Sequence, residues 1–484
     1  MRLYRKEGNT IQILSFPNDN VEKGDYLLIE DSRTNKKLIT QVIDIQFANV
    51  PGLLEELLRD STTEHFAYGE IFDPLEVSSH MNHIQDAWML LCKIRGTIEN
   101  EKLDANVSWL PSRSRSGVKK FPISSLLTHM RDNGNLPINV GETKEAFRFT
   151  INAHDLDGKL NIVTGKKGTG KSHLSKILAL GLIDHGAKVV VLDLNGEYTN
   201  LSFSSRGEKN EYHRRVHVLT PGVNLKVSLA QMDLKVMLNI LVYALNLPGT
   251  STREFRRIWQ SLQQRRAFTL QELGEAIRNW KCNQHVRDAL FSRYHSMLNS
   301  GFFTDNIAKA MTFEEFFEEI RRGGALILNL RDISSVDRQI VVEYTLGKLL
   351  DLLGQWKIKA VFLFAEEAHL YLRETYWDDI VTRMRHFGVF TTFVTNQPDT
   401  IKENIYRQAD NIFLFNFTNE RDLETVSKAA RVDSETVKSI AQDLPPHHCL
   451  LLGKAVKDFP MVAKVKALDV QTMGHTRLFF TDAN

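Results

Sequence analysis

One segment of the chain, Gly165-Lys-Lys-Gly-Thr-Gly-Lys171-Ser172, has the residue types and the G-x-x-x-x-G-K-[ST] spacing that bind nucleotide phosphates. Glycines let the backbone turn tightly and aim successive N–H groups at phosphate oxygens, and a following helix adds its positive N-terminal end. We therefore predict that Lys171 reaches the β- and γ-phosphates of ATP and that the Ser172 hydroxyl coordinates Mg²⁺. The other residues expected to contact the nucleotide here are Gly165, Gly168, Thr169, Gly170 and His173.

Two adjacent carboxylates, Glu366 and Glu367, follow the apolar run Ala360–Ala365. Such a run is typical of a buried parallel strand, and open α/β sheets place their ligands at the C-terminal ends of the strands. We expect Glu366 to hold Mg²⁺, directly or through water, and Glu367 to polarise the attacking water as the general base. The alternative is a pair of solvated acids at the end of a strand.

Two further polar segments end predicted strands. Asp193-Leu-Asn-Gly-Glu-Tyr198 follows the strand after the phosphate-loop helix, so we expect Asp193 near the nucleotide. Asn-Gly is also a strong turn signal, which leaves a plain turn as the alternative. In Thr395-Asn-Gln-Pro398, the amide of Asn396 or Gln397 would sense the γ-phosphate and help to position water. The alternative there is turn chemistry before a proline.

Phosphoryl transfer also needs positive charge that acts on the transferring group. The candidates are Arg383, Arg385 and Arg407, which flank the strand that ends at Thr395 and the strand after it. An arginine that reaches the nucleotide of an adjacent subunit would stabilise the transition state. The sequence does not single out one of the three.

The elements that must position these residues are read from the apolar pattern. Short strands with turn formers between them fill the first ~70 residues and predict a small barrel or sandwich, with a basic loop over Pro111–Lys120. Strands and helices alternate around the phosphate loop, which indicates a doubly wound α/β core. Residues 225–322 show only helical periodicity. We therefore expect a β-rich domain and linker (1–140), the core in two parts (141–224 and 323–484, the latter with a C-terminal β segment) and a helical insertion (225–322).

Composition restricts the class of protein. The 484 residues carry 61 basic and 59 acidic side chains, a net charge of +2, with 42% hydrophobic residues, the profile of a globular protein. No apolar run approaches the ~20 residues needed to cross a bilayer, so we expect no membrane partner. The N-terminus carries no apolar targeting segment, and Cys92, Cys282 and Cys449 form no paired pattern. These observations favour a cytoplasmic location.

Taken in order, these segments resemble the HerA branch of the FtsK–HerA P-loop ATPases. The β-rich start is similar to the family's HAS-barrel, and Gly165–Ser172 resembles its Walker A motif. Asp193–Tyr198 resembles D-x-x-G-E-Y, Glu366–His369 resembles the Walker B motif, and Arg385-His-Phe-Gly388 with Thr395–Pro398 resembles R-x-F-G … Q-x-P. Asn396 stands where the family usually has Gln, and Glu366 where many relatives have Asp.

The resemblance implies a RecA-like P-loop NTPase core with an N-terminal β-barrel and an inserted helical subdomain. It implies a homohexamer that hydrolyses ATP with Mg²⁺ at subunit interfaces and moves double-stranded DNA through a central pore. It also implies an effector docked on the barrel, either a nuclease (NurA-like or other) in DNA end resection or a sirtuin-like NADase or nuclease in antiphage defence. Two alternatives stay open: a nucleotide-bound ring scaffold that assembles and activates an effector enzyme, and a peripheral conjugation or secretion ATPase.

A translocase grips DNA phosphates with lysines and arginines. Our first candidate for a pore loop is Ser202–Arg215, with Arg206, Lys209, Arg214 and Arg215. A second basic cluster lies in the helical insertion and consists of Arg253, Arg256, Arg257, Arg265 and Arg266. For both clusters the alternative is a charged face that contacts only solvent.

Overall fold

The computed structural model describes residues 1–34, 36–48, 87–105, 107–130, 136–266, 268–367, 370, 385–430 and 432–471. The chain forms two units. Unit 1 contains Met1–Asn135, Glu142–Phe149 and Asn416–Lys464, and unit 2 contains Leu136–Gly141, Thr150–Phe415 and Val465–Asn484. Two strands, β8 (Pro137–Glu142) and β9 (Arg148–Asn152), lie where the chain passes between the units.

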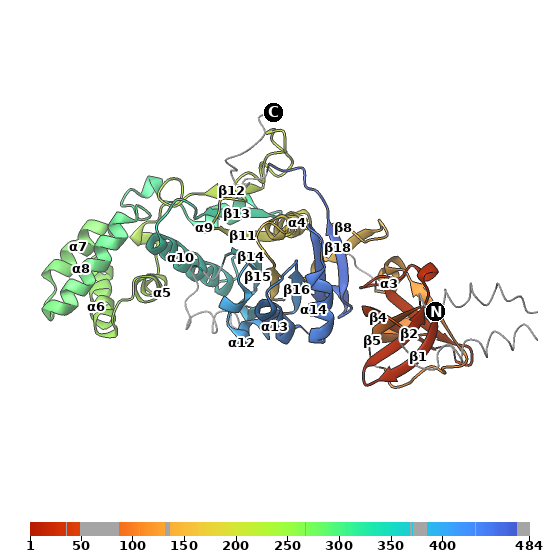
Figure 1. Cartoon of the computed structure of the whole chain (residues 1–484). Coiled ribbons are helices and arrows are strands. Elements are labelled where there is room, and N and C mark those ends of the chain that lie inside the picture. Colours follow the sequence, from red (N-terminus) through yellow and green to blue (C-terminus); the bar gives the residue numbers. More distant parts are fainter. Residues whose placement is uncertain are drawn as a thin grey trace, which may run out of the picture. The chain divides into compact units, whose positions relative to one another are not determined.

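Unit 1 is built on an antiparallel sheet that curls into a partial barrel (Figure 1). Its strands are β1 (Arg2–Glu7), β2 (Thr10–Ser15), β3 (Tyr26–Asp31), β4 (Lys36–Phe47), β5 (Trp88–Glu99), β6 (Lys102–Asp104) and β7 (Ser116–Phe121). The order is β1-β2-β5-β4-β3-β7, with β6 paired to β5, and the two edge strands β1 and β7 also contact each other. Alternate side chains fill the interior, among them Ile11, Ile13, Leu27, Leu38 and Leu90.

Strand β7 corrects one expectation, because a loop was predicted over Pro111–Lys120. Residues 116–121 instead pair with β3, from Asp31↔Ser116 to Tyr26↔Phe121. Val118 packs against the barrel core, while Lys119 and Lys120 form ion pairs with Glu30 and Asp25. Lysines and serines on an edge strand mask its alternating pattern in the sequence.

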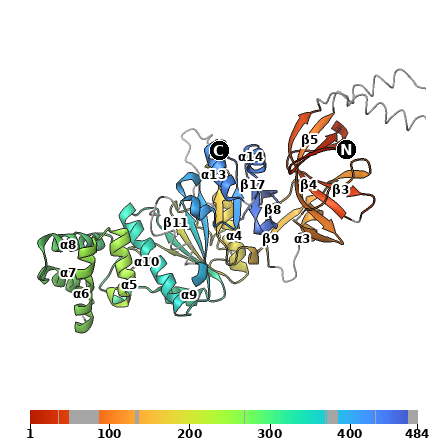
Figure 2. The same cartoon turned by 90° about the horizontal axis from the view of Figure 1, so that it is seen from below.

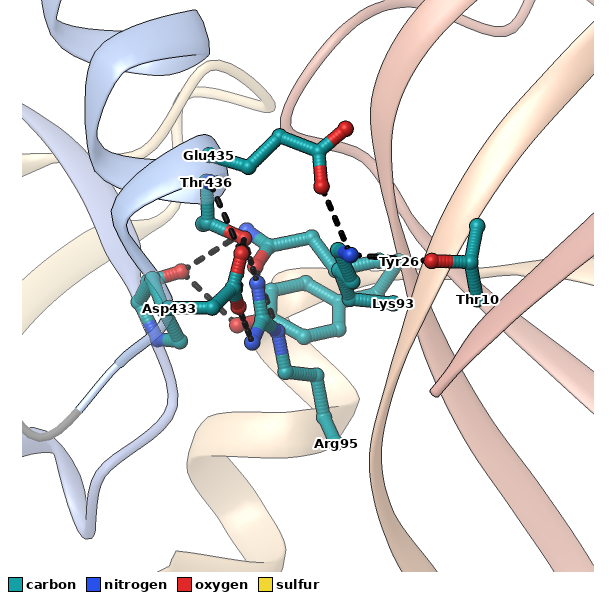
Figure 3. Close-up of polar contacts among 9 residues, drawn as sticks. Thr10, Tyr26, Lys93, Arg95, Asp433, Glu435 and Thr436 are labelled. Atoms are coloured by element: carbon teal, nitrogen blue, oxygen red, sulfur yellow. Dashed lines mark hydrogen bonds and ion pairs between the residues drawn. The ribbon is translucent and has the colours of Figure 1, made fainter. Parts of the chain in front are cut away.

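The C-terminal part of unit 1 contains α13 (Glu420–Ala429), α14 (Ser434–Gln442), β17 (His448–Gly453) and β18 (Met461–Val465). Polar side chains of β5 contact the start of α14 (Figure 3). Arg95 forms an ion pair with Asp433 at 3.1 Å and donates to the Thr436 hydroxyl, and Lys93 lies 2.7 Å from Glu435. These contacts join the barrel to a segment more than 300 residues later in the chain.

Unit 2 contains the parallel sheet of the core. Its strands are β10 (Asn161–Thr164), β11 (Lys188–Asp193), β12 (Val216–Leu219), β13 (Gly324–Asn329), β14 (Val361–Glu366), β15 (Val389–Thr395) and β16 (Asn411–Leu414). Their order is β12-β13-β11-β14-β15-β10-β16, and every neighbouring pair is parallel. The helix α4 (Lys171–Asp184) packs over five of these strands. The phosphate loop, which joins β10 to α4, therefore lies at the C-terminal edge of the sheet.

The predicted helical region consists of several elements between β12 and β13. It contains α5 (Leu234–Asn239), a π-helix (Ile240–Ala244), α6 (Gly249–Arg265), α7 (Leu270–Asn279), α8 (Gln284–Asn299) and α9 (Phe313–Glu319). The helices α6, α7 and α8 contact one another and form a group at one end of unit 2 (Figures 1 and 2). After β13 comes α10 (Ser335–Gly354), which packs on α5 and the π-helix. Within the described ranges, no helix is both long and apolar enough to cross a bilayer.

Candidate nucleotide site

The loop between β10 and α4 has the backbone geometry that phosphate binding needs. Gly168 and Gly170 have φ of 79° and 114°, in the left-handed region that residues with a Cβ avoid. At Gly165 an added Cβ would lie 2.4 Å from Cβ of Phe415, so no larger residue fits. The Thr169 hydroxyl donates to the carbonyl of Lys166 at 2.8 Å and closes the turn. The loop thus forms a backbone cradle at the start of a 14-residue helix.

Lys171 begins α4 and lies close to acidic side chains. Its side chain is buried, and Nζ donates to the carbonyl oxygen of Lys166 at 2.8 Å. Burial lowers the pKa of Lys171, and the negative charges of Glu367, Glu366 and Glu197 oppose that shift. In the sheet, Val394 of β15 pairs with Val163 of β10 on one side and with Glu366 of β14 on the other. The glycine loop and the predicted acid pair therefore lie at the same edge of the sheet, although they are far apart in the sequence.

Glu366 is the last residue of β14 and is 1% exposed. Its Oε1 accepts a hydrogen bond of 2.7 Å from the hydroxyl of Tyr198. Burial is the main cause that raises the pKa of Glu366 to about 8, and the negative charge of Glu197 is the second. Glu367 is half-buried, has φ of 44° and donates its backbone N–H to the carbonyl of Val394 at 2.8 Å.

The carboxylate of Asp193 is fully buried and organises the turn that follows it. Its two oxygens accept the backbone N–H groups of Glu197 and Tyr198 at 2.9 and 2.8 Å. Burial raises the pKa of Asp193 to about 6. These contacts match the alternative that the segment is a strand-ending turn, and they place Tyr198 against Glu366. A direct contact between Asp193 and nucleotide stays a prediction.

Lys176 is a site residue that the sequence reasoning did not identify. It lies in the second turn of α4 and is 3% exposed, with Nζ 3.9 Å from Oε2 of Glu197 and 5.6 Å from the centre of the Tyr198 ring. The available signal was a lysine between Leu174 and the apolar run Ile177–Leu180. A charge at such a position needs a buried partner.

The remaining predicted residues of the loop and of the amide segment differ in their surroundings. Ser172 is half-buried in the first turn of α4, and a ring nitrogen of His173 lies 2.8 Å from the carbonyl oxygen of Lys466. Asn396 is half-buried, and its side-chain oxygen is buried with no hydrogen-bond partner among the described residues. Gln397 is exposed, and its backbone N–H bonds to the Thr395 hydroxyl at 3.0 Å.

The described arginine candidates have partners within the chain. Arg385 forms an ion pair of 3.0 Å with buried Asp410, whose carboxylate also accepts the backbone N–H of Leu160. Arg407 pairs with Glu403 at 2.7 Å on an exposed surface. His369 and Arg383 lie outside the described residues. The identity of an arginine that acts in trans stays a prediction.

The two basic clusters are also described. Arg206, Lys209 and Arg214 are exposed, whereas Arg215 bonds to the backbone carbonyls of Ile183 and Gly323. The second cluster lies on and just after α6, and all five of its arginines are exposed: Arg253, Arg256, Arg257, Arg265 and Arg266. Arg215 is thus half-buried against the fold, and the other basic residues face solvent.

The donor set suits a hard divalent cation that is bound together with a nucleotide. Among the described residues, no group of three or more His, Cys, Asp or Glu side chains is arranged to hold a metal ion. Mg²⁺ in nucleotide sites uses one or two protein oxygens and completes its shell with phosphates and water. A hydroxyl at Ser172 and a carboxylate at Glu366 supply oxygens of that kind.

Comparison with known proteins identifies similar proteins that are named as helicases or probable helicases. A family model described as "Helicase HerA, central domain" matches residues 138–349. The probable helicase MJ1565 of Methanocaldococcus jannaschii is 25% identical over 369 residues, which cover 71% of this chain and 69% of that protein. The DNA double-strand break repair helicase HerA of Saccharolobus solfataricus is 19% identical over 345 residues, 66% of this chain and 68% of that protein.

A solved structure shares the fold. The plasmid coupling protein TrwB, in complex with the non-hydrolysable ATP analogue ADPNP, superposes with a TM-score of 0.51. It is 12% identical, and the match covers 72% of this chain and 93% of that chain. The likeness confirms the predicted fold class, a RecA-like P-loop core.

Proposed function

We propose that the chain is a HerA-like ATPase of the FtsK–HerA P-loop superfamily, and that it hydrolyses ATP as a homohexamer to move along double-stranded DNA. The observation that carries the proposal is that the glycine cradle with Lys171 and the acid pair Glu366 and Glu367 lie at the same edge of the sheet. A backbone cradle for phosphates and two carboxylates beside it are the parts that nucleotide hydrolysis needs. The names of the two curated relatives, both helicases, support action on nucleic acid.

The loop residues bind the triphosphate. The positive-φ turns at Gly168 and Gly170 direct backbone N–H groups into the cradle, and Lys171 supplies a buried positive charge for the β- and γ-phosphates. Ser172 and Glu366 would hold Mg²⁺, which supplies positive charge to the phosphate oxygens. TrwB, which shares the fold, binds an ATP analogue, and this supports ATP as the nucleotide.

Hydrolysis requires a group that orients water and a group that responds to the γ-phosphate. Glu367 directly follows β14 and is the residue that we assign to polarise the attacking water. Between the two amides, Asn396 is the better candidate, because its side chain is half-buried whereas that of Gln397 is exposed. Its amide nitrogen would donate to the γ-phosphate, and its buried side-chain oxygen, which has no partner among the described residues, is an acceptor suited to the attacking water. Arg385 would have to leave Asp410 in order to act in trans.

DNA and partner binding are assigned to other surfaces. The exposed side chains of Arg206, Lys209 and Arg214 would contact DNA phosphates, with the arginines of α6 as the second candidate set. An effector, a nuclease or an NADase, would dock on the barrel of unit 1. The name of the Saccharolobus solfataricus relative supports a setting in double-strand break repair, whereas the antiphage setting rests on the resemblance in sequence alone.

The test of the proposal is movement along duplex DNA. We expect the purified chain to displace a triplex-forming strand from duplex DNA in an ATP-dependent reaction, and to do so as a particle of hexamer mass. Hydrolysis without displacement, together with effector activation that survives Glu367→Gln, would instead support the nucleotide-bound scaffold. A particle that stays monomeric with and without ATP would contradict the ring.

A further inference from the structure

Lys176 places a positive charge where helix packing alone would favour an apolar residue. It lies on α4 within the segment Leu174–Ile183, where every residue except Gly181 is buried. Its own side chain is 3% exposed. Removing an ammonium group from water is costly unless the surroundings compensate it. The position therefore indicates a specific task for the charge.

The surroundings of Lys176 lead directly to Glu366. Its Nζ lies 3.9 Å from Oε2 of Glu197 and 5.6 Å from the centre of the Tyr198 ring. The same tyrosine donates its hydroxyl hydrogen to Oε1 of Glu366 at 2.7 Å. Asp193 holds the turn by accepting the backbone N–H groups of Glu197 and Tyr198. A lysine of α4 thus contacts the turn residue that binds the last carboxylate of β14.

We propose that Tyr198 and Lys176 are positioning residues that orient the carboxylate of Glu366 for the metal–nucleotide complex. Tyr198 fixes one carboxylate oxygen, and Lys176 holds Tyr198 and Glu197 in place through its charge. Groups that bond to a metal ligand fix its orientation, and their loss typically lowers metal affinity or activity about 10- to 100-fold. The inference rests on the proposed function, because it assumes that Glu366 serves a bound nucleotide.

Packing alone does not explain these two side chains. A phenylalanine would fill the space of the fully buried Tyr198 ring, and a methionine would fill that of the Lys176 stem. What each side chain adds beyond volume is one polar group, and each polar group faces an acidic residue of the site. Tyr198→Phe and Lys176→Met therefore remove the proposed task and keep most of the packing.

The test separates nucleotide binding from hydrolysis. Both substitutions are made in a Glu367→Gln background, and binding of the fluorescent analogue mant-ATP is followed while Mg²⁺ is titrated. We expect Tyr198→Phe and Lys176→Met to raise the Mg²⁺ concentration for half-maximal binding by about 10-fold or more. When the same two substitutions are made in the otherwise wild-type chain, which keeps Glu367, kcat should fall with a smaller change in the KM for ATP.

Matched controls remove the same groups elsewhere. Tyr212→Phe removes a hydroxyl that donates to Asp184 at 3.0 Å, and Lys348→Met removes an ammonium 3.1 Å from Glu314. Both should leave the Mg²⁺ titration unchanged.

An unchanged titration in Tyr198→Phe, with unchanged thermal unfolding, would overturn the inference while the proposed function stands. If Lys176→Met does not fold, Tyr198→Phe decides alone. Failure of the Glu367→Gln parent to bind mant-ATP at any Mg²⁺ concentration would overturn both.

Discussion

The hydroxyl of Tyr198 lies 2.7 Å from Oε1 of Glu366, and this hydrogen bond joins two segments that are 168 residues apart. Tyr198 closes the Asp193 turn after β11, and Glu366 ends β14, the strand next to β11. The two segments were identified separately in the sequence as polar strand ends. In the fold they form one buried acidic region beside Lys171.

Glu367→Gln should preserve ATP binding and abolish hydrolysis. The amide keeps the size of the side chain but cannot accept a proton from water, so we expect a loss of at least about 100-fold in kcat. Fluorescent-nucleotide binding and phosphate release measure the two steps separately. Glu420→Gln, an exposed acid on α13, serves as the control. Hydrolysis at the wild-type rate in Glu367→Gln would remove this residue from the reaction.

The two amides after β15 should differ in importance. Asn396→Ala is expected to lower kcat about 10-fold or more, because a group directed at the γ-phosphate acts in the transition state. Gln397→Ala should have little effect, since its side chain is exposed. Steady-state ATP hydrolysis compares the two variants directly. The opposite order of effects would assign the γ-phosphate contact to Gln397.

The ion pair between Arg95 and Asp433 should stabilise unit 1. Asp433 also caps α14 by accepting the backbone N–H of Thr436 at 2.9 Å (Figure 3). Because Asp433 is one-third exposed, we expect Asp433→Ala to cost about 1–3 kcal/mol of unfolding free energy, from the cap and the lost partner of Arg95 together. Asp443→Ala, which removes an exposed pair with Lys23, should cost less than about 0.5 kcal/mol. Chemical denaturation measures both, and equal losses would contradict the assignment.

The same contact predicts an acid dependence. Burial raises the pKa of Asp433, but the Thr436 backbone hydrogen bond and the charge of Arg95 outweigh it, so the pKa lies below its ordinary value. A carboxylate with a lowered pKa stabilises the fold fully above its unfolded pKa of about 3.9, and that contribution is lost as the pH falls through the folded pKa. The difference in stability between wild type and Asp433→Ala should therefore shrink below about pH 4. A difference that grows on acidification would contradict this sign.

The basic segment before β12 should contribute to DNA binding through phosphates. We expect the triple substitution of Arg206, Lys209 and Arg214 by alanine to reduce the slope of log affinity against log salt by up to about 3. The same change at Arg253, Arg256 and Arg265 of α6 is the comparison, since those side chains are also exposed. Fluorescence anisotropy with duplex DNA at several salt concentrations gives both slopes. A larger loss in the α6 variant would reverse our order of the two candidates.

The parallel strands of unit 2 other than β12 were predictable because buried strands carry continuous apolar runs, as in Val361–Ala365. Strand β12 was not predicted, since its four residues, Val216–Leu219, include the polar His217. The phosphate loop and the acid pair were predictable because their chemistry requires particular residues next to such strands. Helix α8 lies inside the predicted helical insertion, but its bounds were not predicted, because only Leu290 and Met297 of its side chains are buried. With two buried residues in 16, the helical period leaves almost no apolar pattern to read.

Contacts between distant segments could not be read from the sequence. The sequence shows Lys176 only as a lysine within a helix, and its contacts with Glu197 and Tyr198 appear only in the fold. Likewise, the sequence presents Arg385 as a candidate for acting in trans, and only the fold shows its ion pair with Asp410. The grouping of Asn416–Lys464 with the N-terminal strands also depends on pairs such as Arg95–Asp433. Local periodicity carries no information about such partners.

The most direct test of the central claim is steady-state ATP hydrolysis at low salt, measured for the wild type and Lys171→Ala with and without linear duplex DNA. The account predicts Mg²⁺-dependent hydrolysis that DNA accelerates, and its loss in Lys171→Ala but not in Lys167→Ala, which changes an exposed lysine of the same loop. A rate of ATP hydrolysis that is the same with and without DNA, or that stays at the wild-type level in Lys171→Ala, would contradict the account.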